Sequence, residues 1–171
     1  MPAPHSGLND KLSGVKMYLD VPGFQFNDSM DPNALQAVEE ALTCFKAIVL
    51  FKNYEIKGDA DRLLIYLVLY IHRCLMELGQ TKPSKDAAAK QLETLAIQCT
   101  VIPGDSSFPL SAFYKTGYPG DFSQYMERLR KETNKRLIEK VYLESPSAPS
   151  KWWLAFAKRK FMNQQLKNSR M

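Results

Sequence analysis

Two pairs of side chains in this sequence are of types that could do chemistry. Asp59 and Asp61 are neighbouring carboxylates, as acid–base catalysis would need, and His72 and Cys74 are potential metal ligands. The two acids directly precede an apolar run, and acidic side chains at the start of a helix stabilise the positive end of its dipole. We therefore interpret them as helix-capping residues. Side chains two positions apart on a helix diverge, so His72 is interpreted as a structural histidine and not as a ligand shared with Cys74.

The other reactive residue types are sparse and scattered. Cys44, Cys74 and Cys99 are odd in number and widely spaced among apolar residues, which indicates reduced core thiols of an intracellular protein and not a disulfide framework. With only His5 and His72 beside them, no zinc-binding pattern is present. The sequence also contains no glycine-rich phosphate loop and no nucleophile elbow. We therefore predict a protein that has no catalytic residues, no cofactor and no metal, and is not an enzyme.

Two stretches of the sequence could instead bind a partner protein. The first is a polar connector with an aromatic residue at its centre, formed by Lys52, Asn53, Tyr54, Glu55 and Lys57. An aromatic side chain among flexible charges is typical of a binding hot spot ringed by polar residues. The alternative is an ordinary turn between helices, with Tyr54 and Ile56 packed against the core. The sequence leaves both interpretations open.

The second stretch is cationic and aromatic, and it predicts partner docking by Lys151, Trp152, Lys158 and Arg159. Residues 145–171 hold six basic and no acidic residues, which leaves 17 basic and 18 acidic residues in the rest of the chain. Such a cationic end indicates an acidic partner, a nucleic acid or a membrane surface. Adjacent helical residues point about 100° apart, so at most one of Trp152 and Trp153 faces the core squarely. The alternative is two tryptophans packed on one corner, with the basic residues merely solvated.

A framework has to position these residues, and the sequence predicts an all-α fold of about five helices around a central buried helix, residues 60–78. Its apolar run, Leu63–Ile71, is too short to span a bilayer, which needs about 20 residues, and it has no polar face for solvent. The acids before the run and Gly79 after it are start and stop signals. A helix this apolar has to be wrapped by several others.

Four further helices are predicted around the central one: residues 31–53, 84–99, 121–142 and 151–166. The stretch 100–120 is rich in Pro and Gly, so we expect it to be irregular apart from one turn at 110–114. Residues 1–30 are expected to form an extended arm with a little strand character, and they lack the pattern of a secretory signal. We predict a single domain, 1–171, with a helical body over 31–166 and a short tail over 167–171.

Several blocks of the sequence are shared with a known family. The most specific are Phe51-Lys-Asn-Tyr-Glu-Ile-Lys57 and Pro149-Ser-Lys-Trp-Trp153, the latter followed by Lys158-Arg159 and Phe161-Met-Asn163. From about Phe45 to Leu166 the chain resembles, collinearly, subunit 3 of the actin-related protein 2/3 complex. Asn134 stands where the family pattern has Gly, and residues 81–90 and 115–121 also differ. We expect these differing positions to lie at the surface.

The resemblance implies an all-helical, non-enzymatic subunit of a multi-protein assembly that nucleates branched actin filaments. It implies docking mainly on actin-related protein 3, at the place where actin-related protein 2 arrives when the complex activates, with the other subunits and the actin filament as further partners. It also implies a location in the cytoplasm, at the actin-rich cortex. Neither a nucleic acid nor a membrane is expected as a partner.

Three competing interpretations remain from the residues alone. The main one is a basic helical nucleic-acid-binding module that uses the C-terminal helix, although this helix lacks the repeated basic and aromatic interleaving of single-strand binders. A membrane-surface helix would have to be free of the core, whereas Phe156 and Phe161 favour packing. The ending Ser169-Arg170-Met171 resembles a peroxisomal targeting tripeptide, a minority interpretation of the localisation.

Overall fold

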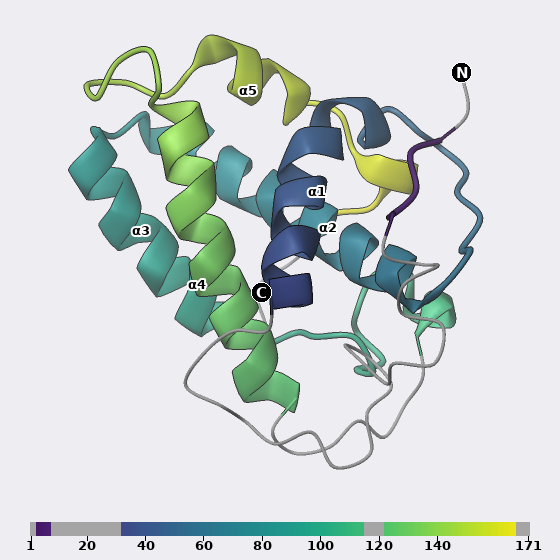
Figure 1. Cartoon of the computed structure of the whole chain (residues 1–171). Helices are drawn as coiled ribbons and strands as arrows, with labels where there is room; N and C mark the ends of the chain where they lie inside the picture. The colour runs from purple at the N-terminus through teal and green to yellow at the C-terminus, as the bar shows by residue number, and fades with distance from the viewer. Residues whose placement is uncertain (1–2, 8–31, 115–121, 167–171) are drawn as a thin grey trace.

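The computed structural model describes residues 3–7, 32–114 and 122–166, and these parts form five α-helices and two short 3-10 helices (Figure 1). This confirms the all-α prediction. The first residues of two predicted helices, Asp31 and Asp121, lie outside the described residues, as do most of the arm and the tail 167–171. The elements are α1 (Pro32–Ile48), α2 (Asp59–Thr81), α3 (Lys85–Gln98), η1 (Ser111–Phe113), α4 (Phe122–Val141), α5 (Lys151–Phe156) and η2 (Phe161–Asn163).

Helix α2 is the core of the fold, as the apolar run predicts. Every side chain from Leu63 to Ile71 is at most 2% exposed, and α1, α3, α4 and α5 all contact this helix. By length and composition alone Ala60–Thr81 could also cross a membrane, but most of that window is buried inside the fold. The other helices cover α2 on all sides, so its lack of a polar face does not require a bilayer around it.

The end of α2 differs from the prediction. The helix does not stop at Gly79 but continues to Thr81, where Lys82 adopts a left-handed conformation with φ 46°. The Lys82 amide then donates to the Leu78 carbonyl at 2.8 Å, which closes the last turn. Because Pro83 follows directly and cannot continue a helix, the stop lies at Lys82 and Pro83. Gly79 stays inside the helix, where an added Cβ would lie in ordinary van der Waals contact with Leu154 at 3.7 Å.

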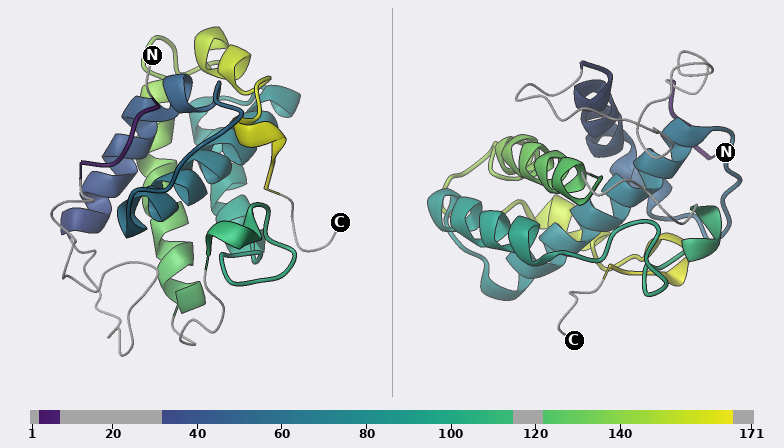
Figure 2. Two further views of the ribbon diagram at one scale, coloured as in Figure 1. Left: turned by 90° about the vertical axis from the view of Figure 1, so that its right-hand side faces the viewer. Right: turned by 90° about the horizontal axis from the view of Figure 1, so that it is seen from below.

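Helices α3 and α4 run side by side and cover one flank of α2 (Figures 1 and 2). The predicted start of α3 is confirmed, since the Ser84 hydroxyl accepts from the Ala87 amide at 3.4 Å. On the solvated face of α4, Lys131 pairs with Glu127 at 3.0 Å, as the spacing of four residues predicts. The Tyr142 hydroxyl donates to the Pro83 carbonyl at 2.8 Å and so joins the two ends of this helix pair.

Asn134 corrects the expectation that the positions departing from the family pattern lie at the surface. Its side chain is buried in α4, where the amide nitrogen donates to the Leu92 carbonyl of α3 at 2.8 Å. Its oxygen accepts from the Tyr70 hydroxyl of α2 at 2.8 Å. An asparagine here therefore bridges three helices. Residues 81–90 are mostly exposed, in line with the expectation, and 115–121 lie outside the described residues.

Replacing Asn134 by alanine is expected to lower the free energy of unfolding by about 1–2 kcal/mol, because the buried Tyr70 hydroxyl loses its acceptor. Urea unfolding followed by circular dichroism measures the change. The double variant with Tyr70→Phe removes both partners, and we expect it to be less destabilised than the sum of the two single variants. A single variant as stable as the parent chain would show that the bridge contributes nothing.

Two helix ends were predicted too late in the sequence. Helix α1 stops at Ile48 and not near Asn53, because the amides of Leu50 and Phe51 bond to carbonyls three residues back, at 3.3 and 3.1 Å, and so close the last turn. The last helix stops at Phe156 and not near Leu166. The Ala157 carbonyl, which a continuing helix would bond to the amide four residues on, accepts instead from His72 Nε2 at 2.8 Å. A tertiary hydrogen bond therefore ends α5, whereas local bonds close the end of α1.

Candidate functional site

The connector of residues 52–57 lies against the segment that follows α5. Besides the bond from Met162 to Phe51, the Lys52 ammonium group donates to the Asn163 side-chain oxygen at 2.8 Å. Figure 2 shows the connector running along the outside of the bundle between α1 and α2. The charged and amide side chains predicted as an interface are exposed here, namely Lys52, Asn53, Glu55 and Lys57.

Tyr54, the aromatic centre of the connector, lies inward. It is only 8% exposed, and its ring packs against His5 at 5.0 Å and edge-on against Phe161 at 5.5 Å between centroids. Burial raises the pKa of its hydroxyl well above the ordinary value, so the group stays protonated and donates to the Pro4 carbonyl at 2.8 Å. This placement matches the alternative of a turn between helices in which Tyr54 and Ile56 pack against the core, since Tyr54 is buried and Ile56 is half-buried.

Asp61 corrects the interpretation of the acids before α2. The N-cap position is Gly58, with no side-chain cap, and the Asp61 carboxylate is fully buried. It accepts from the amide of Ser6 at 2.8 Å, from the amide of Lys57 at 3.0 Å, and from His5 Nδ1 at 2.7 Å. The carboxylate therefore fastens the N-terminal residues 3–7 and the connector to the core. We name these contacts the Asp61 clasp.

The two tryptophans of α5 separate as their helical spacing predicts. Trp153 faces the core and stacks on Phe45 at 6.1 Å between centroids, and the Lys46 ammonium group lies 4.7 Å from its ring. Trp152 points outward and is 70% exposed. Helix α5 is therefore anchored to the core through Trp153 and exposes the Trp152 indole to solvent on its other side.

The basic residues at the C-terminal end are exposed, as predicted: Lys151, Lys158 and Arg159 all lie at the surface. The connector, however, meets residues 161–163 and not the predicted residues of α5. His72 holds the end of α5 from the core side. Burial lowers its pKa and favours the neutral ring, which matches the prediction of a structural histidine.

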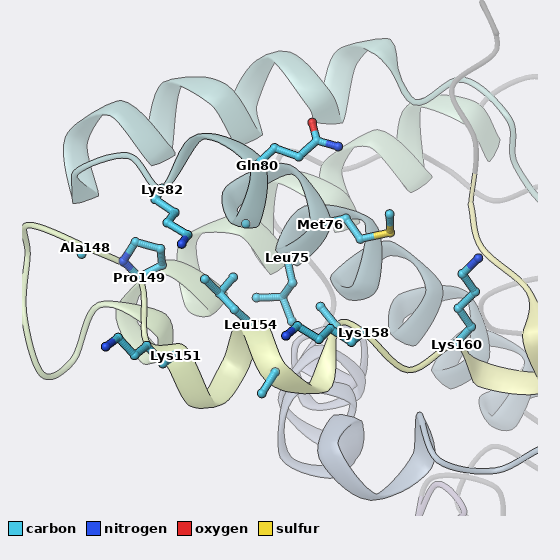
Figure 3. Close-up of a pocket in the computed structure, with 13 residues that line it drawn as sticks. Leu75, Met76, Gln80, Lys82, Ala148, Pro149, Lys151, Leu154, Lys158 and Lys160 are labelled. Carbon is cyan, nitrogen blue, oxygen red and sulfur yellow. The ribbon is translucent and has the colours of Figure 1, made fainter.

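A groove between α2 and α5 was not predicted from the sequence. It encloses about 700 Å³, and Figure 3 shows Leu75 of α2 and Leu154 of α5 lining its middle. Four lysines surround this apolar floor: Lys82, Lys151, Lys158 and Lys160. Only two of them belong to the predicted site, because the sequence does not reveal that the second half of α2 lies beside α5. The sequence feature that could have indicated this groove is Gly79, a glycine within a long apolar helix.

The described residues contain no group of three or more His, Cys, Asp or Glu side chains that could hold a metal. Their three cysteines are free, and burial raises the pKa of the Cys74 and Cys99 thiols, which disfavours the reactive thiolate. What this surface offers chemically is an exposed indole, an apolar groove and exposed ammonium groups. These features define a helical protein with the surface of a binding subunit.

Comparison with known proteins identifies the family. Residues 1–166 match the sequence model of the family described as "P21-Arc: ARP2/3 complex ARPC3 (21 kDa) subunit". The chain belongs to this family.

Its relatives come from distant eukaryotes. The chain is 38% identical over 173 residues to "Actin-related protein 2/3 complex subunit 3" of Dictyostelium discoideum, covering 95% of this chain and 98% of the relative. It is 41% identical over 134 residues to "Probable actin-related protein 2/3 complex subunit 3" of Caenorhabditis elegans, covering 75% and 73%. It is 37% identical over 166 residues to "Actin-related protein 2/3 complex subunit 3" of Saccharomyces cerevisiae, covering 93% and 86%.

Proposed function

We propose that this chain is a non-catalytic subunit of the actin-related protein 2/3 complex and helps to assemble the complex that nucleates branched actin filaments. The observation that carries the proposal is the family match over residues 1–166, together with relatives named as this subunit, which the chain matches over 73% to 98% of their length. The cytoplasm and its actin cytoskeleton are the corresponding location. The peroxisomal interpretation of residues 169–171 stays a minority alternative, and these residues lie outside the described structure.

The docking surface belongs to this proposal too. We propose that the subunit binds mainly actin-related protein 3, close to actin-related protein 2. The docking residues are Lys151, Trp152, Lys158 and Arg159 together with the exposed side chains of the connector. Trp152 supports this assignment, since a 70% exposed indole beside ammonium groups has the composition of an interface anchor. Tyr54 acts indirectly, by holding the connector in place from beneath.

Co-purification tests the function directly. The tagged chain, captured from a eukaryotic lysate, is expected to bring down actin-related protein 3 and the other subunits in fixed proportion. Recovery of RNA or DNA instead, with binding that falls steeply as salt rises, would favour the nucleic-acid-binding module. Recovery of neither would overturn the assignment to the complex.

Replacing Trp152 by alanine is expected to weaken assembly by about 1–3 kcal/mol, because a large aromatic anchor is lost from the interface. Competition between variant and parent chains for the remaining subunits gives this difference. Leu143→Ala is the matched control, since Leu143 is 83% exposed and lies outside α5 and the connector. Helicity and thermal midpoint should stay unchanged in both variants. Assembly of Trp152→Ala at parental affinity would place the docking surface elsewhere.

A further inference from the structure

The groove between α2 and α5 carries uncompensated positive charge. Lys82, Lys151, Lys158 and Lys160 line it, and none of their ammonium groups has an ion-pair partner among the described residues. No acidic side chain stands among the described residues that line the groove. Lys85 and Lys131, by contrast, do have acidic partners: Lys85 pairs with Glu139 and Lys131 pairs with Glu93. The groove is therefore a local concentration of like charges.

The floor of the groove is apolar and open. Leu75 is buried, whereas Met76 and Leu154 are partly exposed and contribute unbranched or flexible apolar surface. Gly79 keeps the floor low, since an added Cβ there would meet only the end of Leu154 at 3.7 Å. Figure 3 shows Lys82 and Lys151 near Pro149 at one end of the groove and Lys160 at the other end. Apolar side chains can thus enter along the middle while charges meet the lysines at both ends.

We propose that this groove receives an amphipathic helix of a neighbouring subunit, with a short apolar stripe flanked by acidic side chains. The apolar stripe packs on the partly exposed Met76 and Leu154, with Leu75 buried beneath them, which is the helix-in-groove mode of peptide recognition. The flanking carboxylates pair with the four lysines, whose mutual repulsion the partner relieves. This inference rests on the proposed function and specifies the chemistry of the segment that α5 binds.

The chemistry of the groove favours this occupant over the others. A second copy of this chain would bring a net charge of +5 towards four lysines, so repulsion opposes self-association. A membrane surface is flat, whereas Leu75 and Pro149 lie buried at the bottom of a concavity. A nucleic acid would leave the apolar floor without a matching surface, because its phosphates need only the lysines.

A variant that fills the groove distinguishes a loss of docking from a loss of folding. Gly79→Leu places an apolar side chain in the groove, the position has no strained backbone, and leucine favours helix more than glycine does. We expect the variant to keep or raise the thermal midpoint while its affinity for the other subunits falls at least about tenfold. Ala87→Leu adds the same side chain at an exposed position of α3 and should leave the affinity unchanged. A folded Gly79→Leu chain with parental affinity would overturn the proposal.

Two measurements on the assembled complex identify the occupant. Acetylation of lysines should be suppressed on assembly at Lys82, Lys151, Lys158 and Lys160, but not at Lys90, which is exposed on α3. A photo-crosslinking residue in place of Ala155 should then join an acidic helix of another subunit. Lysines that stay reactive in the complex would overturn the proposal, as would a crosslink to a basic segment, a lipid or a second copy. A chain that never enters the complex overturns the proposed function as well, so the two failures are distinguishable.

Discussion

Leu67→Asp is expected to abolish the soluble, folded chain. Leu67 is fully buried in the middle of α2, with buried neighbours on both sides in the sequence. An unpaired carboxylate at this depth costs several kcal/mol, and the lost packing of the leucine adds about 2–5 kcal/mol more. Stabilities of small domains are about 5–15 kcal/mol, so the folded state would no longer dominate.

Soluble yield, circular dichroism and thermal unfolding of the purified chain measure this effect. Leu143→Asp serves as the matched control, because Leu143 is 83% exposed and the same change there should leave folding intact. Leu67→Ala is a milder substitution at the same position, and we expect it to lower the free energy of unfolding by about 2–5 kcal/mol through the cavity alone. A soluble Leu67→Asp chain with the helicity and thermal midpoint of the parent would contradict the central position of α2.

The buried helix could be predicted because its pattern allows one solution. Nine consecutive apolar residues have no polar face, so any fold that contains them as a helix has to cover every side. The starts of α1 and α3 could be predicted for a local reason. Pro32 fits a first helical turn, and Ser84 supplies a side-chain acceptor to the free amides at a helix start.

The end of α5 and the burial of Asn134 could not be predicted, because distant residues decide them. His72 binds the Ala157 carbonyl, which a continuing helix would have used for its own hydrogen bond. Asn134 is polar, and a polar residue is ordinarily expected at the surface. In the interior its side chain is instead hydrogen-bonded to the Tyr70 hydroxyl and to the Leu92 carbonyl. No local pattern contains these partners.

Some features of the candidate site could also be predicted from the sequence, and others could not. The angle between consecutive helical residues separates Trp152 from Trp153 without knowledge of the fold. Tyr54 stayed open because the arm decides its position, through the carbonyl of Pro4 and the ring of His5. The groove was missed because it exists only when the second half of α2 lies beside α5.

Asp61→Ala is expected to lower the free energy of unfolding by about 2–4 kcal/mol, because two backbone amides and the His5 ring lose a charged acceptor. The Ser6 amide is buried with this carboxylate, so water does not replace the lost bond at no cost. Urea unfolding gives the change in stability. Glu55→Ala on the same connector is the control, since Glu55 is exposed and its loss should change stability by less than about 0.5 kcal/mol.

The same variant tests whether the arm and the connector act as one unit. Without the Asp61 clasp, residues 3–7 are expected to leave the core and uncover Tyr54, whose hydroxyl and ring contact Pro4 and His5. Amide hydrogen exchange should then accelerate at Ser6 and at Lys57 together, while the amides of α3 keep their protection. Because the exposed connector residues belong to the proposed docking surface, assembly with the other subunits should weaken as well. If Lys57 stays protected while Ser6 exchanges freely, the clasp holds only the arm, and the connector owes its position to Lys52, Phe51 and the segment after α5.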